Sequence, residues 1–147
     1  MQVKDIMTTD PACCTPQTTL QEAVQLMIDN DCGEIPVVDD FDTAMPVGVL
    51  TDRDIVCRTI GKGLNPMEMT VGDCMSTPLI SITPESSLSE CYHLLEENQI
   101  RRVPVVNASG KCVGIVSLAD IARNAPRADA GEVLQEVSAS TASASNI

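Results

Sequence analysis

Two short stretches of the chain share one pattern: a glycine, two hydrophobic residues, a hydroxyl residue and, three positions later, an aspartate. They run from Gly48 to Asp54 and from Gly114 to Asp120. A hydroxyl residue with an acid three positions later is typical of a helix start, where each side chain bonds the other's backbone N–H. The same place favours anions, because the first N–H groups of a helix lack partners within it. A short carboxylate there can also accept two neighbouring hydroxyls, so the pattern is open to two interpretations, a structural cap and a ribose-binding site.

Few other groups in the sequence could do chemistry. His93 is the only histidine, and the chain lacks a nucleophile elbow, a Walker lysine loop and a Rossmann glycine signature. The 147 residues carry a net charge of −12, with 21 acidic residues against 9 basic ones. Nucleic-acid binding depends on Lys and Arg that neutralise phosphates. We therefore expect a protein that is not an enzyme, has no obligatory cofactor and binds no nucleic acid.

The seven cysteines are odd in number and form no CxxC motif. Neither a disulfide framework nor a metal site is predicted from such spacing, and the thiols indicate a reducing, cytoplasmic environment. Cys13 and Cys14 are adjacent, which leaves open a thiol-responsive role. The uninterrupted apolar stretches are a few residues long, so no membrane contact is expected.

An internal repeat organises most of the chain. An offset of 68 residues aligns Pro36-Val37-Val38 with Pro104-Val105-Val106, and after a two-residue insertion an offset of 66 aligns Asp54-Ile55 with Asp120-Ile121. We predict one repeat with its linker over residues 1–66, a second over 67–126, and a flexible tail rich in serine and alanine over 127–147.

Each repeat is predicted to form an extended lead-in followed by helix, strand, strand and helix. The first helices begin after Thr19-x-x-Glu22 and Ser87-x-x-Glu90, and the second helices begin near Asp52 and Leu118. The strands are expected at 35–38, 47–50, 103–106 and 112–116. The residues expected to be buried on the first helix are Leu20, Ala23, Val24, Met27 and Ile28.

These features together resemble the cystathionine-β-synthase-type (CBS) domain pair over roughly residues 3–125. The matching stretches are DIM and DCM at the repeat starts, IPVVD and VPVVN before the second strands, and VGVLTDRDIV and VGIVSLADIA. The resemblance implies an α+β fold of two pseudo-symmetric β-α-β-β-α repeats packed through their sheets, and a homodimer. It also implies an adenosine-containing ligand (AMP, ADP, ATP, NAD or S-adenosylmethionine) bound in two clefts between the repeats, and a regulatory role in signal transduction.

The resemblance assigns residues to each cleft. In one cleft Asp120 would take the ribose hydroxyls, Ser117 the phosphate or ribose, and Arg102 the phosphate, with Ile115 beside the base. In the other cleft Asp54 and Thr51 would take the parts of Asp120 and Ser117. The Asp120 cleft comprises Thr9, Cys13, Cys32, Gly33, Arg102, Ile115, Ser117 and Asp120, and the Asp54 cleft comprises Val49, Thr51, Asp54, Ile80, Ile100 and Arg101.

The two clefts are expected to differ, because Arg102 aligns with Glu34. A carboxylate repels phosphate, and losing a charge-assisted hydrogen bond costs roughly 1.5–3 kcal/mol. We therefore predict tighter binding of a phosphorylated ligand at Asp120. The leading hypothesis is a nucleotide-binding sensor that acts on a separate, unknown target protein. The alternatives are a ligand-free dimerisation or docking module and a thiol-responsive interaction protein.

Overall fold

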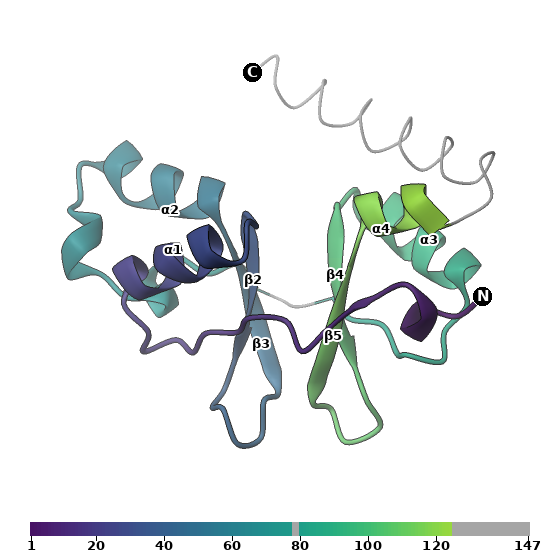
Figure 1. Cartoon of the computed structure of the whole chain (residues 1–147). Helices are drawn as coiled ribbons and strands as arrows, with labels where there is room; N and C mark the ends of the chain where they lie inside the picture. Colours follow the sequence, from purple (N-terminus) through teal and green to yellow (C-terminus); the bar gives the residue numbers. More distant parts are fainter. Residues whose placement is uncertain (78–79, 125–147) are drawn as a thin grey trace, which may run out of the picture. The chain divides into compact units, whose positions relative to one another are not determined.

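The computed structural model describes residues 1–77 and 80–124, which divide into two compact units (Figure 1). Unit 2 contains α1 (Leu20–Asp29), β2 (Glu34–Val38), β3 (Pro46–Thr51) and α2 (Asp52–Arg58). Unit 1 contains α3 (Leu88–Asn98), β4 (Arg102–Val106), most of β5 (Cys112–Ser117) and α4 (Leu118–Asn124). The predicted order of helix, strand, strand and helix is therefore confirmed in both repeats. The predicted tail, 127–147, lies outside the described residues.

The lead-in of each repeat belongs to the unit formed by the other repeat. Residues Met1–Thr9 join unit 1, and the segment that precedes Ile80 joins unit 2. Strand β1 (Thr8–Thr9) pairs antiparallel with β5, with Thr8 opposite Ile115. In unit 2 Ser76 makes the equivalent bridge to Val49, through N–O distances of 2.8 and 3.1 Å. The compact units therefore do not coincide with the sequence segments 1–66 and 67–126.

The glycine that opens each sequence pattern lies where a lead-in passes over the last strand. A Cβ on Gly48 would come within 2.7 Å of the Ser76 carbonyl oxygen. A Cβ on Gly114 would come within 2.6 Å of the Met7 sulfur and 3.0 Å of the Thr8 carbonyl oxygen. Only a residue without a side chain lets the two backbones pair at this distance.

The first helix of each repeat begins at the predicted hydroxyl residue. Thr19 Oγ1 accepts a hydrogen bond from the Glu22 N–H at 3.1 Å, and Ser87 Oγ accepts one from the Glu90 N–H at 3.0 Å. These bonds satisfy an N–H group that has no partner inside the helix. The predicted helix starts are confirmed.

The core of unit 2 lies between its two helices and the β2–β3 pair. On α1 the buried residues are Leu20, Ala23 and Met27, whereas Val24 and Ile28 are 37% and 66% exposed. The prediction that Val24 and Ile28 are buried was therefore wrong, because only one stripe of this helix meets the sheet. The buried cluster consists of Cys14, Leu20, Ala23, Met27, Ile35, Val37, Leu50, Ile55, Val71 and Cys74.

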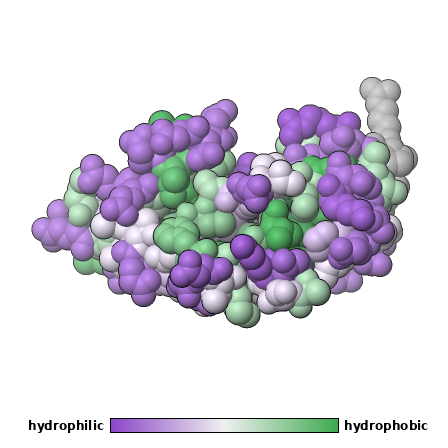
Figure 2. All heavy atoms as spheres, turned by 60° about the horizontal axis from the view of Figure 1, so that its bottom comes forward, coloured by the Kyte–Doolittle hydropathy of each residue, from purple (hydrophilic) through white to green (hydrophobic). Residues whose placement is uncertain are grey.

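Residues of both kinds, hydrophilic and hydrophobic, reach the surface of the described chain. On the face shown in Figure 2, hydrophilic residues predominate and hydrophobic residues show in small areas among them. Among residues 1–77 and 80–124, no helix has the length and apolar character needed to cross a bilayer.

Replacing Gly48 with alanine tests the close approach of the lead-in. Gly48→Ala should lower the free energy of unfolding by about 1–3 kcal/mol, because the Ser76 carbonyl oxygen belongs to the backbone and cannot move aside alone. The measurement is urea unfolding followed by circular dichroism. Gly61→Ala is the matched control, since its Cβ would lie 3.4 Å from the Val56 carbonyl oxygen, and it should leave stability unchanged or slightly higher. Equal losses in the two variants would contradict the argument.

Candidate functional site

In unit 2 the aspartate of the repeated pattern is fixed by the start of α2. Thr51 Oγ1 accepts a hydrogen bond from the Asp54 N–H at 2.9 Å, and Asp54 Oδ2 accepts one from the Thr51 N–H at 3.2 Å. This reciprocal pair is a capping box. Because β3 runs directly into α2, the carboxylate is held at the strand-to-helix junction.

Unit 1 repeats this geometry at the start of α4. Ser117 Oγ accepts a hydrogen bond from the Asp120 N–H at 3.1 Å, and Asp120 Oδ2 accepts one from the Ser117 N–H at 2.9 Å. Asp120 is buried, with 8% of its surface exposed. The capping interpretation of the sequence pattern is therefore confirmed at both positions. In both boxes the capping bond is made by Oδ2, and Oδ1 takes no part in it.

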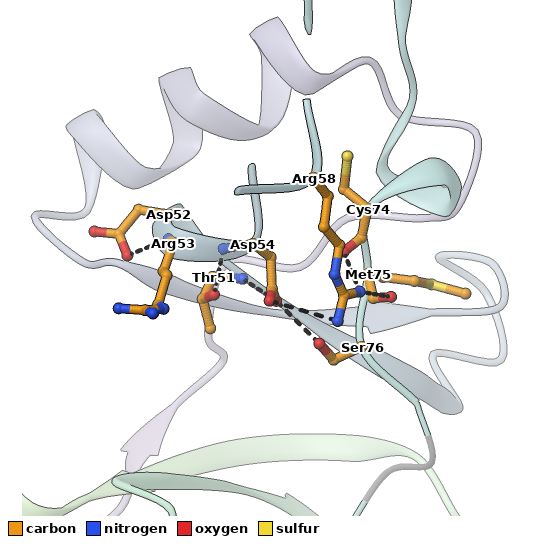
Figure 3. Close-up of polar contacts among 8 residues, drawn as sticks. All are labelled: Thr51, Asp52, Arg53, Asp54, Arg58, Cys74, Met75 and Ser76. Atoms are coloured by element: carbon orange, nitrogen blue, oxygen red, sulfur yellow. Dashed lines mark hydrogen bonds and ion pairs between the residues drawn. The ribbon is translucent and has the colours of Figure 1, made fainter. Parts of the chain in front are cut away.

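Two further residues, which the sequence analysis missed, contact the Asp54 carboxylate. Ser76 Oγ donates to Asp54 Oδ2 at 3.1 Å, and Arg58 Nη2 lies 3.9 Å from Asp54 Oδ1 (Figure 3). Arg58 follows Asp54 by four positions, a spacing that places oppositely charged side chains together on a helix. That spacing was the signal available in the sequence. Ser76 has no local signal, since it reaches Asp54 only because the lead-in pairs with β3.

Arg58 also fastens α2 to the lead-in. Its Nη1 donates to the carbonyl oxygens of Cys74 and Met75, at 2.8 Å in each case (Figure 3). The planar guanidinium can hold several acceptors at once, which a lysine ammonium cannot do in the same geometry. The position of Asp54 and the path of the lead-in are therefore linked through one side chain.

The partners of Asp120 are different. Arg123 Nη2 donates to Asp120 Oδ1 at 2.9 Å, but the Arg123 side chain is 70% exposed. Asn124 occupies the position that matches Arg58 by the 66-residue offset, and its Nδ2 donates to the Asp120 carbonyl oxygen at 2.7 Å. An exposed ion pair is screened by water and contributes little. A ligand hydroxyl at Asp120 Oδ1 would therefore meet an exposed arginine, whereas one at Asp54 Oδ1 would meet Arg58, which also holds the lead-in.

The residues predicted for each cleft come from both units. The eight predicted for the Asp120 cleft comprise five in unit 1 and three in unit 2, and the six predicted for the Asp54 cleft comprise four in unit 2 and two in unit 1. Within unit 1, Thr9 lies opposite Gly114, Ile115 lies opposite Thr8, and the Leu118 N–H donates to the Arg101 carbonyl oxygen. The remaining unit 1 residues are Ile100, Arg102, Ser117 and Asp120, and those in unit 2 are Cys13, Cys32, Gly33, Val49, Thr51, Asp54 and Ile80.

Glu34, the residue that aligns with Arg102, lies beside the Asp54 junction. It pairs with Thr51 across the β2–β3 ladder, and both are partly buried. An acidic side chain next to the capping box makes this junction less favourable for a phosphate. The difference in ligand binding between the two positions stays a prediction.

The pKa values of the adjacent thiols Cys13 and Cys14 are both raised. Burial raises the pKa of Cys14 to about 12. The pKa of Cys13 is also raised, first by a side-chain hydrogen bond with Cys112 and then by burial. Both thiols therefore stay protonated near neutral pH, whereas attack on an oxidant or a disulfide requires the thiolate. Over the described part of the chain, no three His, Cys, Asp or Glu side chains are grouped so that they could hold a metal ion.

The sequence was compared with models of known protein families. The family model for the CBS domain matches residues 3–58 and 71–127, the two repeats. The chain belongs to the CBS-domain family. No catalytic family is indicated by this match.

CBS domain-containing protein YhcV of Bacillus subtilis is 42% identical over 92% of this chain and 94% of its own length. Hypoxic response protein 1 of Mycobacterium tuberculosis is 38% identical over 84% of each chain.

Solved structures of CBS proteins share the fold. A crystal structure of Hypoxic Response Protein I with two coordinated zinc ions is 36% identical, with a TM-score of 0.77 over 86% of this chain and all of that one. A crystal structure of CBSX2 in complex with AMP is 29% identical, with a TM-score of 0.71 over 84% of this chain and 95% of that one. The predicted class, an α+β fold of two CBS repeats, is confirmed by such neighbours.

Removing Arg58 tests its role in fastening the lead-in. Arg58→Ala should lower the free energy of unfolding by about 1–2 kcal/mol, because two carbonyl oxygens lose a charged donor. Arg123→Ala is the matched control and should cost about 0.5 kcal/mol or less, since its ion pair is exposed. Chemical unfolding of both variants measures the difference, and losses of equal size would contradict the assigned role.

Alkylation of the native protein tests the state of the thiols. At pH 7.5 iodoacetamide should modify the exposed Cys57 first, whereas Cys14 and Cys91 should react slowly. Burial raises the pKa of Cys91 to about 11 and that of Cys14 to about 12, so the reactive thiolate is scarce and becomes more abundant only as the pH rises towards these values. Peptide mass spectrometry over a time course gives the rates. Rapid modification of Cys14 at neutral pH would contradict this expectation and support the thiol-responsive hypothesis.

Proposed function

We propose that this protein is a non-catalytic regulatory module of the cytoplasm that binds an adenosine nucleotide and acts in trans on a partner protein. The observation that carries the proposal is the pair of aspartates, each fixed at a helix start through Oδ2, with Oδ1 facing an arginine that a ligand hydroxyl would have to displace. A carboxylate in this position can accept both hydroxyls of a ribose. The AMP complex of the relative CBSX2 supports an adenosine ligand.

Asp120 is proposed as the centre of the preferred site. Its carboxylate is buried and fixed before any ligand arrives, so little ordering free energy is lost on binding. Arg102, the first residue of β4, would hold the phosphate, and Ile115 would contact the base. Thr9 and Ser117 would complete the unit 1 part of the site. Cys13, Cys32 and Gly33 would complete it from unit 2.

Asp54 is proposed as the weaker position. Ser76 and Arg58 already contact its carboxylate, and Glu34 lies beside the junction. A ligand hydroxyl that binds at Asp54 Oδ1 must displace Arg58, and its phosphate would lie near the Glu34 carboxylate. The proposed ligand of this site is therefore less negatively charged, and its other residues would be Val49, Thr51, Ile80, Ile100 and Arg101.

Regulation by such a ligand requires that two conformations bind it with unequal affinity, since equal affinity shifts no population. The proposed assembly is a homodimer, and the relative described as a hexameric CBS-CP12 protein supports self-association. The seven free cysteines support a reducing, cytoplasmic location. A docking module without a ligand is the second candidate, and nucleotide binding distinguishes the two.

Thermal unfolding with AMP, ADP, ATP, NAD and S-adenosylmethionine tests the proposal. A ligand at 100 times its dissociation constant should stabilise the protein by about 2.7 kcal/mol.

Asp120→Asn should weaken binding by about 10- to 100-fold, because it removes a charged acceptor but keeps an oxygen for the Ser117 N–H. Asp54→Asn, the matched control, should weaken it less than about threefold. Equal effects would contradict the asymmetry, and no stabilisation by any ligand would favour the docking module.

The role of Arg102 has its own test. Arg102→Ala should weaken AMP binding by about 10- to 100-fold and leave adenosine binding unchanged, because only AMP carries the phosphate that the guanidinium would contact. Isothermal titration calorimetry of both ligands gives the ratio. Lys62→Ala, at an exposed cation outside both proposed sites, serves as the control for a general loss of positive charge. If Arg102→Ala weakened the binding of AMP and of adenosine equally, the proposed contact between Arg102 and the phosphate would be contradicted.

A further inference from the structure

Two of the seven cysteines meet through their side chains within unit 2. The thiols of Cys13 and Cys112 share a hydrogen bond, although one lies near the start of the chain and the other near the end of its described part. Cys13 is partly exposed, and Cys112 is buried with 8% of its surface exposed. Two thiols in contact are the starting arrangement for a disulfide, in which the sulfur atoms lie about 2 Å apart.

Backbone hydrogen bonds hold both cysteines beside the β2–β3 pair. Next to Cys13, the Cys14 N–H donates to the Pro36 carbonyl oxygen of β2 at 3.2 Å. The Cys112 N–H donates to the Ala44 carbonyl oxygen at 2.8 Å, in the segment that joins β2 to β3. The fold therefore keeps the two thiols together, so that a bond between them does not depend on a chance encounter.

The surroundings of the pair decide which thiol loses its proton first. The Cys13 thiol donates to the Pro11 carbonyl oxygen at 3.3 Å, a contact that favours the protonated form because a thiolate and a carbonyl oxygen repel each other. The pKa of Cys13 is raised further by its hydrogen bond with Cys112, by burial and by the charge that Cys112 carries as a thiolate. Cys112 is therefore the first nucleophile, and Cys13 keeps its proton.

The other repeat shows that the fold does not require thiols at these places. By the 68-residue offset the residue that matches Cys13 is Ser81, and by the 66-residue offset the residue that matches Cys112 is Pro46. Neither residue can form a disulfide. The two cysteines are thus a feature of one of the two equivalent places, which indicates a chemical role in addition to packing.

We propose that Cys13 and Cys112 are a peroxide-sensitive modification site that forms a reversible intramolecular disulfide. The Cys112 thiolate attacks one oxygen of hydrogen peroxide, the O–O bond breaks, and the other oxygen leaves as hydroxide, which takes up a proton to become water. The Cys13 sulfur then attacks the sulfur of the Cys112 sulfenic acid. The S–O bond breaks, and the oxygen leaves with the Cys13 proton as a second water. The two thiols lose two electrons, which the peroxide gains.

The disulfide joins two segments near the places where the chain passes between the units. Asp10 is the first residue of unit 2 after the lead-in, and Cys112 is the last residue of unit 2 before β5 continues in unit 1 at Val113. A covalent bond between Cys13 and Cys112 limits how far these segments can separate. Oxidation therefore narrows the range of conformations open to the chain, which gives a redox signal a structural effect.

Peroxide treatment of the native full-length chain tests the proposal. After the remaining thiols are alkylated, peptide mass spectrometry without reduction should find a product linked through Cys13 and Cys112, two hydrogens lighter than its parts and released by dithiothreitol. It should form faster as the pH rises, because the thiolate is the nucleophile. Cys112→Ser should abolish the product, and Cys14→Ser, the matched control at the neighbouring thiol, should retain it. Circular dichroism establishes that both variants are folded.

Urea unfolding provides a second measurement on the wild-type chain. The oxidised chain should have an unfolding equilibrium constant about 30- to 1,000-fold lower than that of the reduced chain, because the disulfide closes a long loop in the unfolded state. Dithiothreitol should remove the difference. The Cys112→Ser chain should show no difference after the same treatment.

The outcomes separate this site from nucleotide binding. A wild-type chain in which Cys13 and Cys112 both remain open to alkylation under denaturing conditions after peroxide treatment would overturn the proposal. A Cys13–Cys14 disulfide, or a linked product that persists in Cys112→Ser, would overturn it as well. Disulfide formation needs no nucleotide, and nucleotide binding is measured by thermal unfolding of the reduced chain, so the failure of one proposal is distinguishable from the failure of the other.

Discussion

The close passage of each lead-in over the last strand of the other repeat is the constraint on which both junctions depend. Thr8 pairs with Ile115 and Ser76 pairs with Val49, and each pairing requires a glycine in the strand beneath. A repeat of about sixty residues buries too little surface to be stable by itself. The exchange of lead-ins adds a strand pairing to each unit. Each unit therefore needs residues from both repeats to fold. It also brings Ser76 and the backbone held by Arg58 to the Asp54 carboxylate.

The capping box and the ligand site make different demands on the same carboxylate. One oxygen of Asp54 and of Asp120 stabilises its own helix start, which fixes the side chain before any ligand arrives. The other oxygen differs between the units, because Asp120 meets an exposed arginine and Asp54 lies near the arginine that holds the lead-in. Duplication thus preserved the position of the carboxylate while changing its surroundings. This divergence is the basis of the proposed difference between the two junctions in binding an anionic ligand.

The sequence was sufficient to predict the elements but insufficient to predict their surroundings. Hydroxyl caps, alternating strands and the repeat offset act over a few residues, so the helix starts at Thr19 and Ser87 could be located from local chemistry. The contact of Ser76 with Asp54 spans 22 positions and follows from strand pairing, which no local pattern indicates. Val24 and Ile28 were wrongly expected in the core because their burial also depends on neighbours that no local pattern indicates. Helical periodicity identifies an apolar side of a helix, but the width of the buried stripe is set by what packs against it.

The amino-acid sequence by itself determined the duplication, the order of elements in each repeat and the two aspartates at their helix starts, since these depend on backbone capping and on periodicity. Only the tertiary structure decided which repeat each lead-in joins, because that choice is made by long-range pairing between segments about a hundred residues apart, such as Thr8 and Ile115. It also decided which apolar side chains remain exposed. Burial depends on the neighbours that the fold supplies, and the residue types alone do not specify those neighbours.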